Sequence, residues 1–94
     1  MSNEKVALVT GTSTGIGLAT AIDLARNGYS VFAGMRNPGK SEALREAAEG
    51  LPVTVVQMDV TEDASVAGAI EAAGGPQAID VLVNNAGMGG ATPL

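Results

Sequence analysis

Cysteine and histidine are both absent from this 94-residue chain, and each absence removes a class of site. Without cysteine, the chain can form neither a disulfide framework nor a zinc site with thiolate ligands. Without histidine, a metal ion could be held only by carboxylates, and the acidic residues are not clustered in a suitable way. The sequence therefore predicts no metal site.

Long apolar runs and basic charge are also scarce. No apolar run approaches the roughly 20 residues that cross a bilayer, and the first residues lack the basic and then apolar pattern of a signal peptide. The net charge of −5 argues against nucleic acid or an anionic membrane as a partner. With 46% hydrophobic and 16% charged residues, the composition is typical of one folded domain or part of one, and we expect a cytoplasmic protein.

The sequence does contain a regular alternation of short apolar runs and segments with helical spacing. Apolar runs that are typical of buried strands lie at 5–10, 29–35, 53–58 and 79–83. Helical spacing of apolar residues predicts helices at 15–27, 42–49 and about 62–73. We expect Gly28 to end the first helix in a left-handed conformation, and Ser41 and Thr61 to cap the second and third helices.

This β-α-β-α-β-α-β pattern predicts an α/β fold. Strands that are apolar on both faces belong in a parallel sheet covered by helices on both sides. Right-handed crossovers then give a Rossmann-type doubly wound sheet of four strands in the order 3-2-1-4, with three helices. In that arrangement a ligand lies where the strand order reverses, at the carboxyl ends of the first and fourth strands.

The turn after the first strand, residues 10–17, has the sequence Thr-Gly-Thr-Ser-Thr-Gly-Ile-Gly. Its first glycine allows a sharp turn, and the later two let the main chain approach a pyrophosphate that lies at the start of the following helix. A plain loop of glycine and hydroxyl residues is the alternative, but the flanking strand and helix favour the phosphate site. The candidate cofactor-binding residues here are Gly11, Thr12, Ser13, Thr14, Gly15, Ile16 and Gly17.

Three further features follow the other strands. Arg36 follows the second strand, Asp59 and Val60 follow the third, and an Asn-Asn-Ala-Gly turn at 84–87 follows the fourth. Each has a structural alternative: Asp59 could simply favour the start of the coming helix, and Asn with Gly is common in ordinary tight turns.

Together these four features resemble the short-chain dehydrogenase/reductase family, in family order and at family-like intervals along the whole chain. The resemblance implies a nicotinamide dinucleotide whose pyrophosphate and adenosine ribose lie on the first glycine turn. It implies that the Asp59 carboxylate accepts a hydrogen bond from the adenine amino group, and that Val60 offers backbone to the ring edge. It also implies that Asn85, Ala86 and Gly87 lie along the ribose and toward the nicotinamide.

Arg36 favours NADP(H) over NAD(H). An acid at the end of the second strand would bind the ribose 2′-hydroxyl of NAD and repel a 2′-phosphate, but that position is Met35 and the next residue is basic. A guanidinium can bind a phosphate in bidentate fashion and stack on adenine. We also expect hydroxyl donors from residues 12–14. The chain departs from many NADP-binding relatives in having Thr14, rather than a basic residue, before the second glycine.

The resemblance further implies proton transfer by a tyrosine with a lysine four residues later, and this pair is missing. The only tyrosine is Tyr29, and Ala33 lies four residues after it. No catalytic residue is therefore assigned. We expect residues 1–94 to be the amino-terminal, cofactor-binding part of a single Rossmann domain that lacks its catalytic half. Such a part would be inactive alone and would self-associate through the exposed edge of its fourth strand.

The complete protein would then move a hydride between nicotinamide and a carbonyl or alcohol substrate. Two alternatives remain at this point. One is a dinucleotide-binding module without catalysis. The other is an epimerase or dehydratase among the extended relatives, which the glycine spacing and the Asn-Asn-Ala-Gly turn disfavour.

Overall fold

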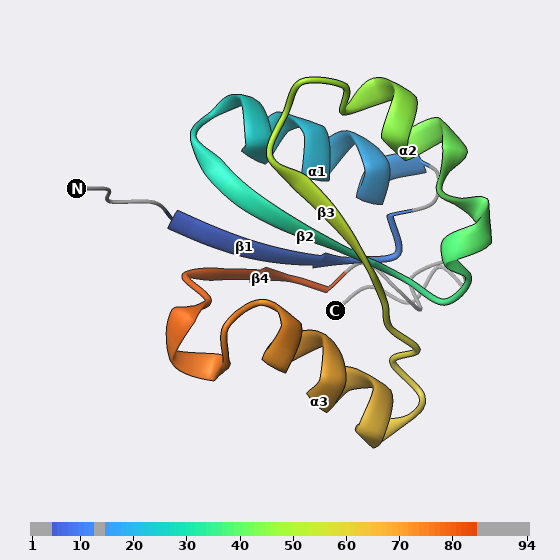
Figure 1. Ribbon diagram of the computed structural model, residues 1–94, viewed down its shortest axis with the longest axis vertical. Helices are drawn as coiled ribbons and strands as arrows, with labels where there is room; N and C mark the ends of the chain where they lie inside the picture. The colour runs from blue at the N-terminus through green and yellow to red at the C-terminus, as the bar shows by residue number, and fades with distance from the viewer. Residues whose placement is uncertain (1–4, 13–14, 85–94) are drawn as a thin grey trace.

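The computed structural model describes residues 5–12 and 15–84, which form a parallel four-stranded sheet between helices (Figure 1). Its elements are β1 Lys5–Thr10, α1 Gly15–Arg26, β2 Tyr29–Met35, the 3₁₀ turn η1 Pro38–Lys40, α2 Glu42–Ala47, β3 Val53–Gln57, α3 Asp63–Ala72, the 3₁₀ turn η2 Pro76–Ala78 and β4 Val81–Val83. The strand order is β3-β2-β1-β4, so the predicted fold and strand order are confirmed. None of the helices in these described ranges has both the length and the apolarity that a membrane crossing needs.

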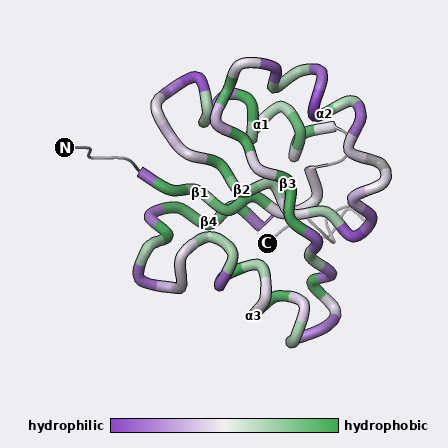
Figure 2. Tube along the Cα trace, in the orientation of Figure 1, coloured by the Kyte–Doolittle hydropathy of each residue, from purple (hydrophilic) through white to green (hydrophobic). Residues whose placement is uncertain are grey.

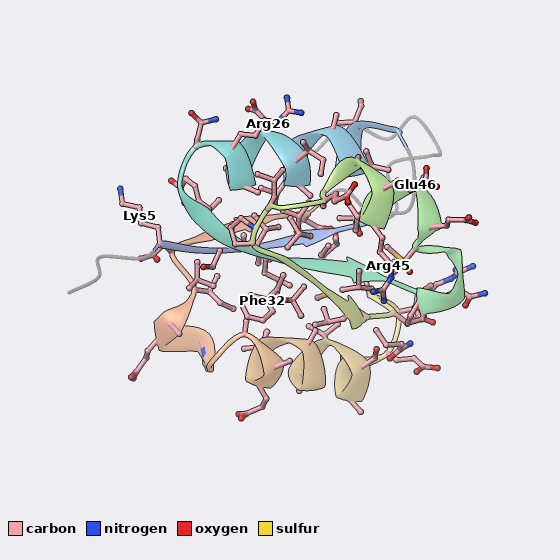
Figure 3. The ribbon with its side chains drawn as sticks, turned by 45° about the horizontal axis from the view of Figure 1, so that its top comes forward. Lys5, Arg26, Phe32, Arg45 and Glu46 are labelled. Carbon is pink, nitrogen blue, oxygen red and sulfur yellow. The ribbon has the colours of Figure 1, made fainter. Side chains whose placement is uncertain are left out.

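Alternation of side chains along the strands divides the core into two halves. One half lies between the sheet and the helices α1 and α2, and the other between the sheet and α3 (Figure 1). Ala7 and Val9 of β1 belong to the first half, whereas Leu8, between them, belongs to the second. In β2, Phe32 points to the α3 side (Figure 3). The strands are accordingly the most continuously apolar part of the chain (Figure 2), as strands buried on both faces require.

The register brings the carboxyl ends of the strands to one edge of the sheet. Thr10 at the end of β1 pairs with Gly34 of β2, and Gly34 pairs with Val56 of β3. On the other side of β1, Val9 pairs with Val83. The four loops that sequence analysis singled out therefore all begin at this edge.

One of the two predicted helix caps is confirmed in position, and the other is wrong. Ser41 is the N-cap residue of α2, as predicted, although its side chain makes no capping bond and instead accepts a 2.7 Å hydrogen bond from Arg45 Nε. Before α3, the cap position belongs to Glu62 rather than Thr61. The Thr61 hydroxyl instead donates to the Asp59 carboxylate at 2.6 Å, and Thr61 N donates to the same oxygen at 3.0 Å, so Thr61 belongs to the Asp59 turn that precedes the helix.

Most other differences concern where elements end. The first helix ends at Arg26, and Gly28 has a φ of 96°, so the predicted left-handed residue is confirmed. The second helix ends at Ala47 rather than at residue 49, and β3 ends at Gln57.

The fourth strand begins at Val81 rather than at residue 79, because η2 and Asp80 precede it. Asp80 Oδ2 accepts a hydrogen bond from Val6 N, and Asp80 N donates to Val6 O, both at 2.8 Å. The side chain thus takes the place of a main-chain acceptor at the start of the β1–β4 pairing.

Candidate functional site

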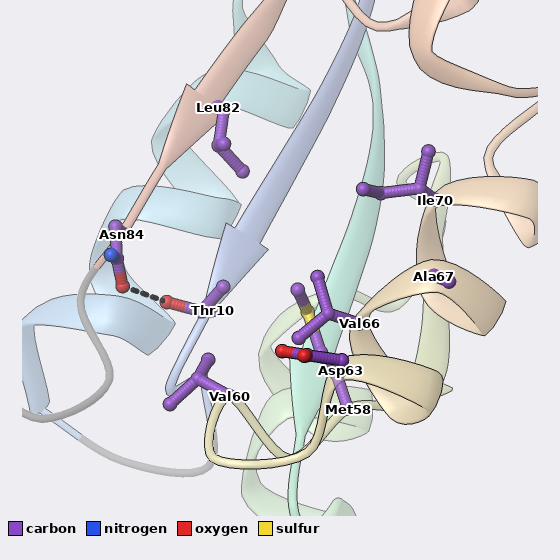
Figure 4. Close-up of a pocket in the computed structure, with 9 residues that line it drawn as sticks. All are labelled: Thr10, Met58, Val60, Asp63, Val66, Ala67, Ile70, Leu82 and Asn84. Atoms are coloured by element: carbon purple, nitrogen blue, oxygen red, sulfur yellow. Dashed lines mark hydrogen bonds between the residues drawn. The ribbon is translucent and has the colours of Figure 1, made fainter.

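The turns after β1 and β4 meet at the carboxyl edge of the sheet. The Thr10 hydroxyl donates to Asn84 Oδ1 at 3.2 Å, and it also lies 3.5 Å from the carbonyl oxygen of Val83 (Figure 4). The predicted meeting of these two turns is therefore confirmed for the residues that begin them. Asn85, Ala86 and Gly87 lie outside the described residues.

The glycine turn after β1 has the backbone conformation that its sequence predicts. Gly11 and Gly15 have φ values of 66° and 67°, in the left-handed region where a side chain is strained. Thr12, between them, is completely buried. Its N–H and its hydroxyl both donate to the carbonyl oxygen of Gly34, at 3.2 and 3.1 Å. The Thr12 hydroxyl thus ties the turn to the end of β2.

Helix α1 begins at Gly15 and presents its first turn at this edge. Gly17 is buried against the sheet, whereas the neighbouring Ile16 is 74% exposed. The first backbone N–H groups of a 12-residue helix and the positive end of its dipole favour an anion here. Ser13 and Thr14 lie outside the described residues.

Asp59 shapes the loop between β3 and α3. Its Oδ1 accepts hydrogen bonds from Thr61 N at 3.0 Å and from the Thr61 hydroxyl, so the carboxylate closes a tight turn. These two bonds lower the pKa of the Asp59 carboxyl below its ordinary value, desolvation opposes the shift, and the positive charge of Arg36 adds to it. The carboxylate therefore organises its own loop, whether or not it also contacts a ligand.

Arg36 is the first residue after β2 and is exposed. Its carbonyl oxygen accepts a hydrogen bond of 3.3 Å from Gln57 Nε2, at the end of the neighbouring strand. The positive charge of Arg36 also contributes, after the two Thr61 bonds, to lowering the pKa of the Asp59 carboxyl in the neighbouring loop.

A cavity of about 430 Å³ opens between this edge of the sheet and α3 (Figure 4). Its lining residues come from the ends of β1, β3 and β4 and from α3: Thr10, Met58, Val60, Asp63, Val66, Ala67, Ile70, Leu82 and Asn84. Of the residues predicted from sequence, Val60 lines it, and Arg36 and Asp59 belong to the neighbouring loops. The candidate cofactor-binding residues predicted from sequence do not include Met58 or Asn84, although Asn84 begins the predicted Asn-Asn-Ala-Gly turn and each lies directly after a strand that ends at this edge. No group of acidic side chains within the described ranges is arranged to hold a metal ion.

The comparisons with known proteins decide the family. A family model described as short chain dehydrogenase matches residues 5–94. The chain belongs to the short-chain dehydrogenase family. Its strand order is that of a Rossmann-like fragment of this family's fold, and the family uses NAD or NADP.

Several relatives are similar over nearly the whole chain. Retinol dehydrogenase 8 of Homo sapiens is 46% identical over 96% of this chain. Among solved structures, glucose dehydrogenase of Caenorhabditis elegans is 39% identical over 93% of the chain, with a TM-score of 0.78. An actinorhodin polyketide ketoreductase solved with NADPH is 39% identical over 90%, with a TM-score of 0.68. The chain spans only 30%, 39% and 34% of these three proteins, respectively.

Proposed function

We propose that the chain is the NADP(H)-binding portion of a short-chain oxidoreductase. In this proposal residues 1–94 are the amino-terminal part of a single Rossmann domain, and its catalytic half lies outside them. The bound dinucleotide would supply the hydride acceptor or donor for a carbonyl or alcohol substrate. The observation that carries the cofactor choice is the exposed Arg36 directly after β2, beside the Asp59 loop.

The surroundings of Arg36 favour a 2′-phosphate over a bare ribose. Met35, where an acid would select NAD, is 2% exposed and part of the core, so the position before Arg36 offers no carboxylate. An exposed guanidinium can bind a phosphate with two parallel hydrogen bonds. The likeness to a ketoreductase solved with NADPH supports the same choice.

The rest of the dinucleotide would follow the edge of the sheet toward β4. The Gly11–Gly17 turn and the first turn of α1 would hold the pyrophosphate, because both left-handed glycines open the main chain to an anion. Asp59 and Val60 would hold the adenine. Asn85, Ala86 and Gly87 would lie along the second ribose and the nicotinamide.

Proton transfer would come from residues beyond this chain. Tyr29 is the first residue of β2 and pairs with Lys5, so it lies at the amino edge of the sheet, opposite the glycine turn. A tyrosine at that edge is too far from the nicotinamide to exchange a proton with the substrate. We therefore expect the chain to bind cofactor without turning over a carbonyl substrate, which is also the behaviour of a pure binding module.

A fluorescence titration with NADPH and with NADH tests the proposal. We expect tighter binding of NADPH, and Arg36→Ala should weaken it about ten-fold or more, as loss of a charged hydrogen bond predicts. Binding of NADH should change by less than about two-fold in the variant, because its 2′-hydroxyl needs no cation. Equal binding of both cofactors by a folded wild-type chain would contradict the NADP assignment.

Arg26→Ala is the matched control. Arg26 is an exposed arginine in the last turn of α1, away from the edge that holds the glycine turn. Arg26→Ala changes the net charge of the chain by the same amount as Arg36→Ala. Comparing the two variants therefore separates local recognition by Arg36 from the general effect of net charge. It should leave the preference for NADPH unchanged.

A further inference from the structure

A continuous series of side-chain hydrogen bonds joins the loop after β2 to the loop after β3. Gln57, the last residue of β3, donates from Nε2 to the carbonyl oxygen of Arg36 at 3.3 Å. Ser65, in the first turn of α3, donates its hydroxyl to Gln57 Oε1 at 3.1 Å. The same hydroxyl oxygen accepts a 2.8 Å bond from the main-chain N–H of Asp59. We call these three bonds the Gln57–Ser65 relay.

The chemistry of the groups allows the relay only one direction. The Arg36 carbonyl can only accept, so Gln57 must turn its NH₂ group toward it and its oxygen toward Ser65. The Ser65 hydroxyl has a single hydrogen, which that oxygen takes, and its lone pairs remain for the Asp59 N–H. If the Gln57 amide were reversed, two oxygens would face each other at Arg36. The three bonds therefore fix one another.

The relay continues the β2–β3 pairing beyond the sheet. The main-chain bonds between these segments end with Met58 N donating to Met35 O at 2.9 Å. One residue further on, the chain leaves the sheet at Arg36 on one side and at Asp59 on the other. The relay spans this point, so it connects the two loops where the main chain no longer does.

We propose that Gln57 and Ser65 are positioning residues for the adenosine end of the dinucleotide. By fixing the spacing between the Arg36 main chain and the Asp59 loop, they let the 2′-phosphate and the adenine be bound together. The relay holds Arg36 by its carbonyl, and the guanidinium takes no part in it. This inference rests on the proposed function, and it assigns cofactor selectivity in part to two side chains that do not contact the cofactor.

Calorimetric titration of the chain with adenosine 2′,5′-bisphosphate and adenosine 5′-monophosphate tests the proposal. Both ligands need the adenine loop, but only the first needs Arg36. Gln57→Met keeps the length of the side chain without its polar atoms. Gln57→Met and Ser65→Ala should each lower the preference for the bisphosphate about five-fold or more, because each removes two of the three bonds. Affinity for the monophosphate should stay within about two-fold.

Two further variants serve as controls. Ser65→Thr keeps the hydroxyl and should keep the wild-type preference. Gln77→Met makes the same change as Gln57→Met at an exposed position of η2, which precedes β4 at the amino edge of the sheet. It should leave both affinities unchanged.

The outcomes separate this inference from the proposed function. A wild-type chain that shows no preference for the bisphosphate overturns both. An intact preference in wild type, Gln57→Met and Ser65→Ala overturns the inference alone. Equal weakening of both ligands, with a lower melting temperature, also overturns it, since that is what a purely structural role predicts. Should Ser65→Ala fail to fold, Gln57→Met decides, because Gln57 is exposed and its replacement does not disturb the core.

Discussion

The Asp59 carboxylate connects the local chemistry of one loop to the pH dependence of the whole fold. Its pKa is lowered from the ordinary 3.8, first by the bond from the Thr61 hydroxyl and then by the bond from the Thr61 N–H. A depressed pKa stabilises the folded state above the ordinary value, and this stabilisation is lost as the pH falls through the folded-state pKa.

We therefore expect that the free energy of unfolding, measured in urea, falls as the pH drops below about 4, and that Thr61→Val reduces the fall. Valine has no hydroxyl, so the strongest of the bonds that depress the pKa disappears while the main-chain bond remains. The quantity to compare is the difference between the pH profiles of the wild type and the variant. Thr54→Val, at an exposed position of β3, is the control. Identical pH profiles for wild type and Thr61→Val would contradict the assigned cause.

At the scale of elements, replacing a glycine with alanine should have opposite effects on the stability of the fold in β2 and in α3. A Cβ on Gly34 of β2 would lie 2.9 Å from Met58 Sδ, 3.1 Å from Met58 Cβ and 3.3 Å from Val9 O. The methionine sulfur can move, but the main-chain oxygen cannot. Gly34→Ala should therefore destabilise the fold by about 1–3 kcal/mol, the usual cost of overpacking.

Gly68 in α3 provides the matched comparison. It is exposed, and a Cβ there would meet nothing within 4 Å. Because alanine restricts the unfolded chain and favours a helix, Gly68→Ala should stabilise the fold by about 0.5–1 kcal/mol. Urea unfolding of both variants measures the two changes in the free energy of unfolding, which should have opposite signs. Destabilisation by Gly68→Ala, or a neutral Gly34→Ala, would show that the packing described around these glycines is wrong.

Sequence predicted those parts of the fold that depend on neighbouring residues. The bounds of β1 and β2 follow from apolar runs that end in a turn, and the left-handed Gly11 and Gly28 follow from the need for a glycine where the chain reverses. Ser41 is the N-cap of α2 as predicted, but Thr61 is not the N-cap of α3, because its N–H and its hydroxyl both bond to the carboxylate of Asp59, two residues earlier.

The parts that sequence could not predict depend on residues far apart in the chain. Asp80 bonds to Val6 across 74 positions, so nothing near residue 79 indicated that β4 would begin later. In the site, the positions of Arg36 and Asp59 could be predicted because each follows a strand. The Gln57–Ser65 relay could not, because its members meet only after β3 has paired with β2 and α3 has packed on the sheet.

For the whole molecule, the two faces of the sheet are covered to different extents in the described part of the chain. Leu82 of β4 points to the α3 side and is 60% exposed (Figure 4). It borders the cavity beside α3 and a second, largely apolar one of about 300 Å³ that Ile79 and Leu8 also line. Among the described strands, β4 pairs with β1 alone. An apolar face beside a strand edge is the arrangement that promotes association between copies.

We therefore expect the 94-residue chain to self-associate, and Leu82→Lys to shift it toward the monomer in sedimentation velocity runs at increasing concentration. A lysine at a strand edge opposes pairing with a second chain, because its charge would be buried there. Ile16→Lys is the control, since Ile16 is the other large exposed hydrophobic residue in the described part and lies at the start of α1. Both changes make the net charge less negative than −5, so weaker association would not come from greater repulsion between copies. A wild-type chain that is monomeric throughout and melts sharply at high temperature would contradict this prediction, and an equal effect of both lysines would place the contact elsewhere than on β4.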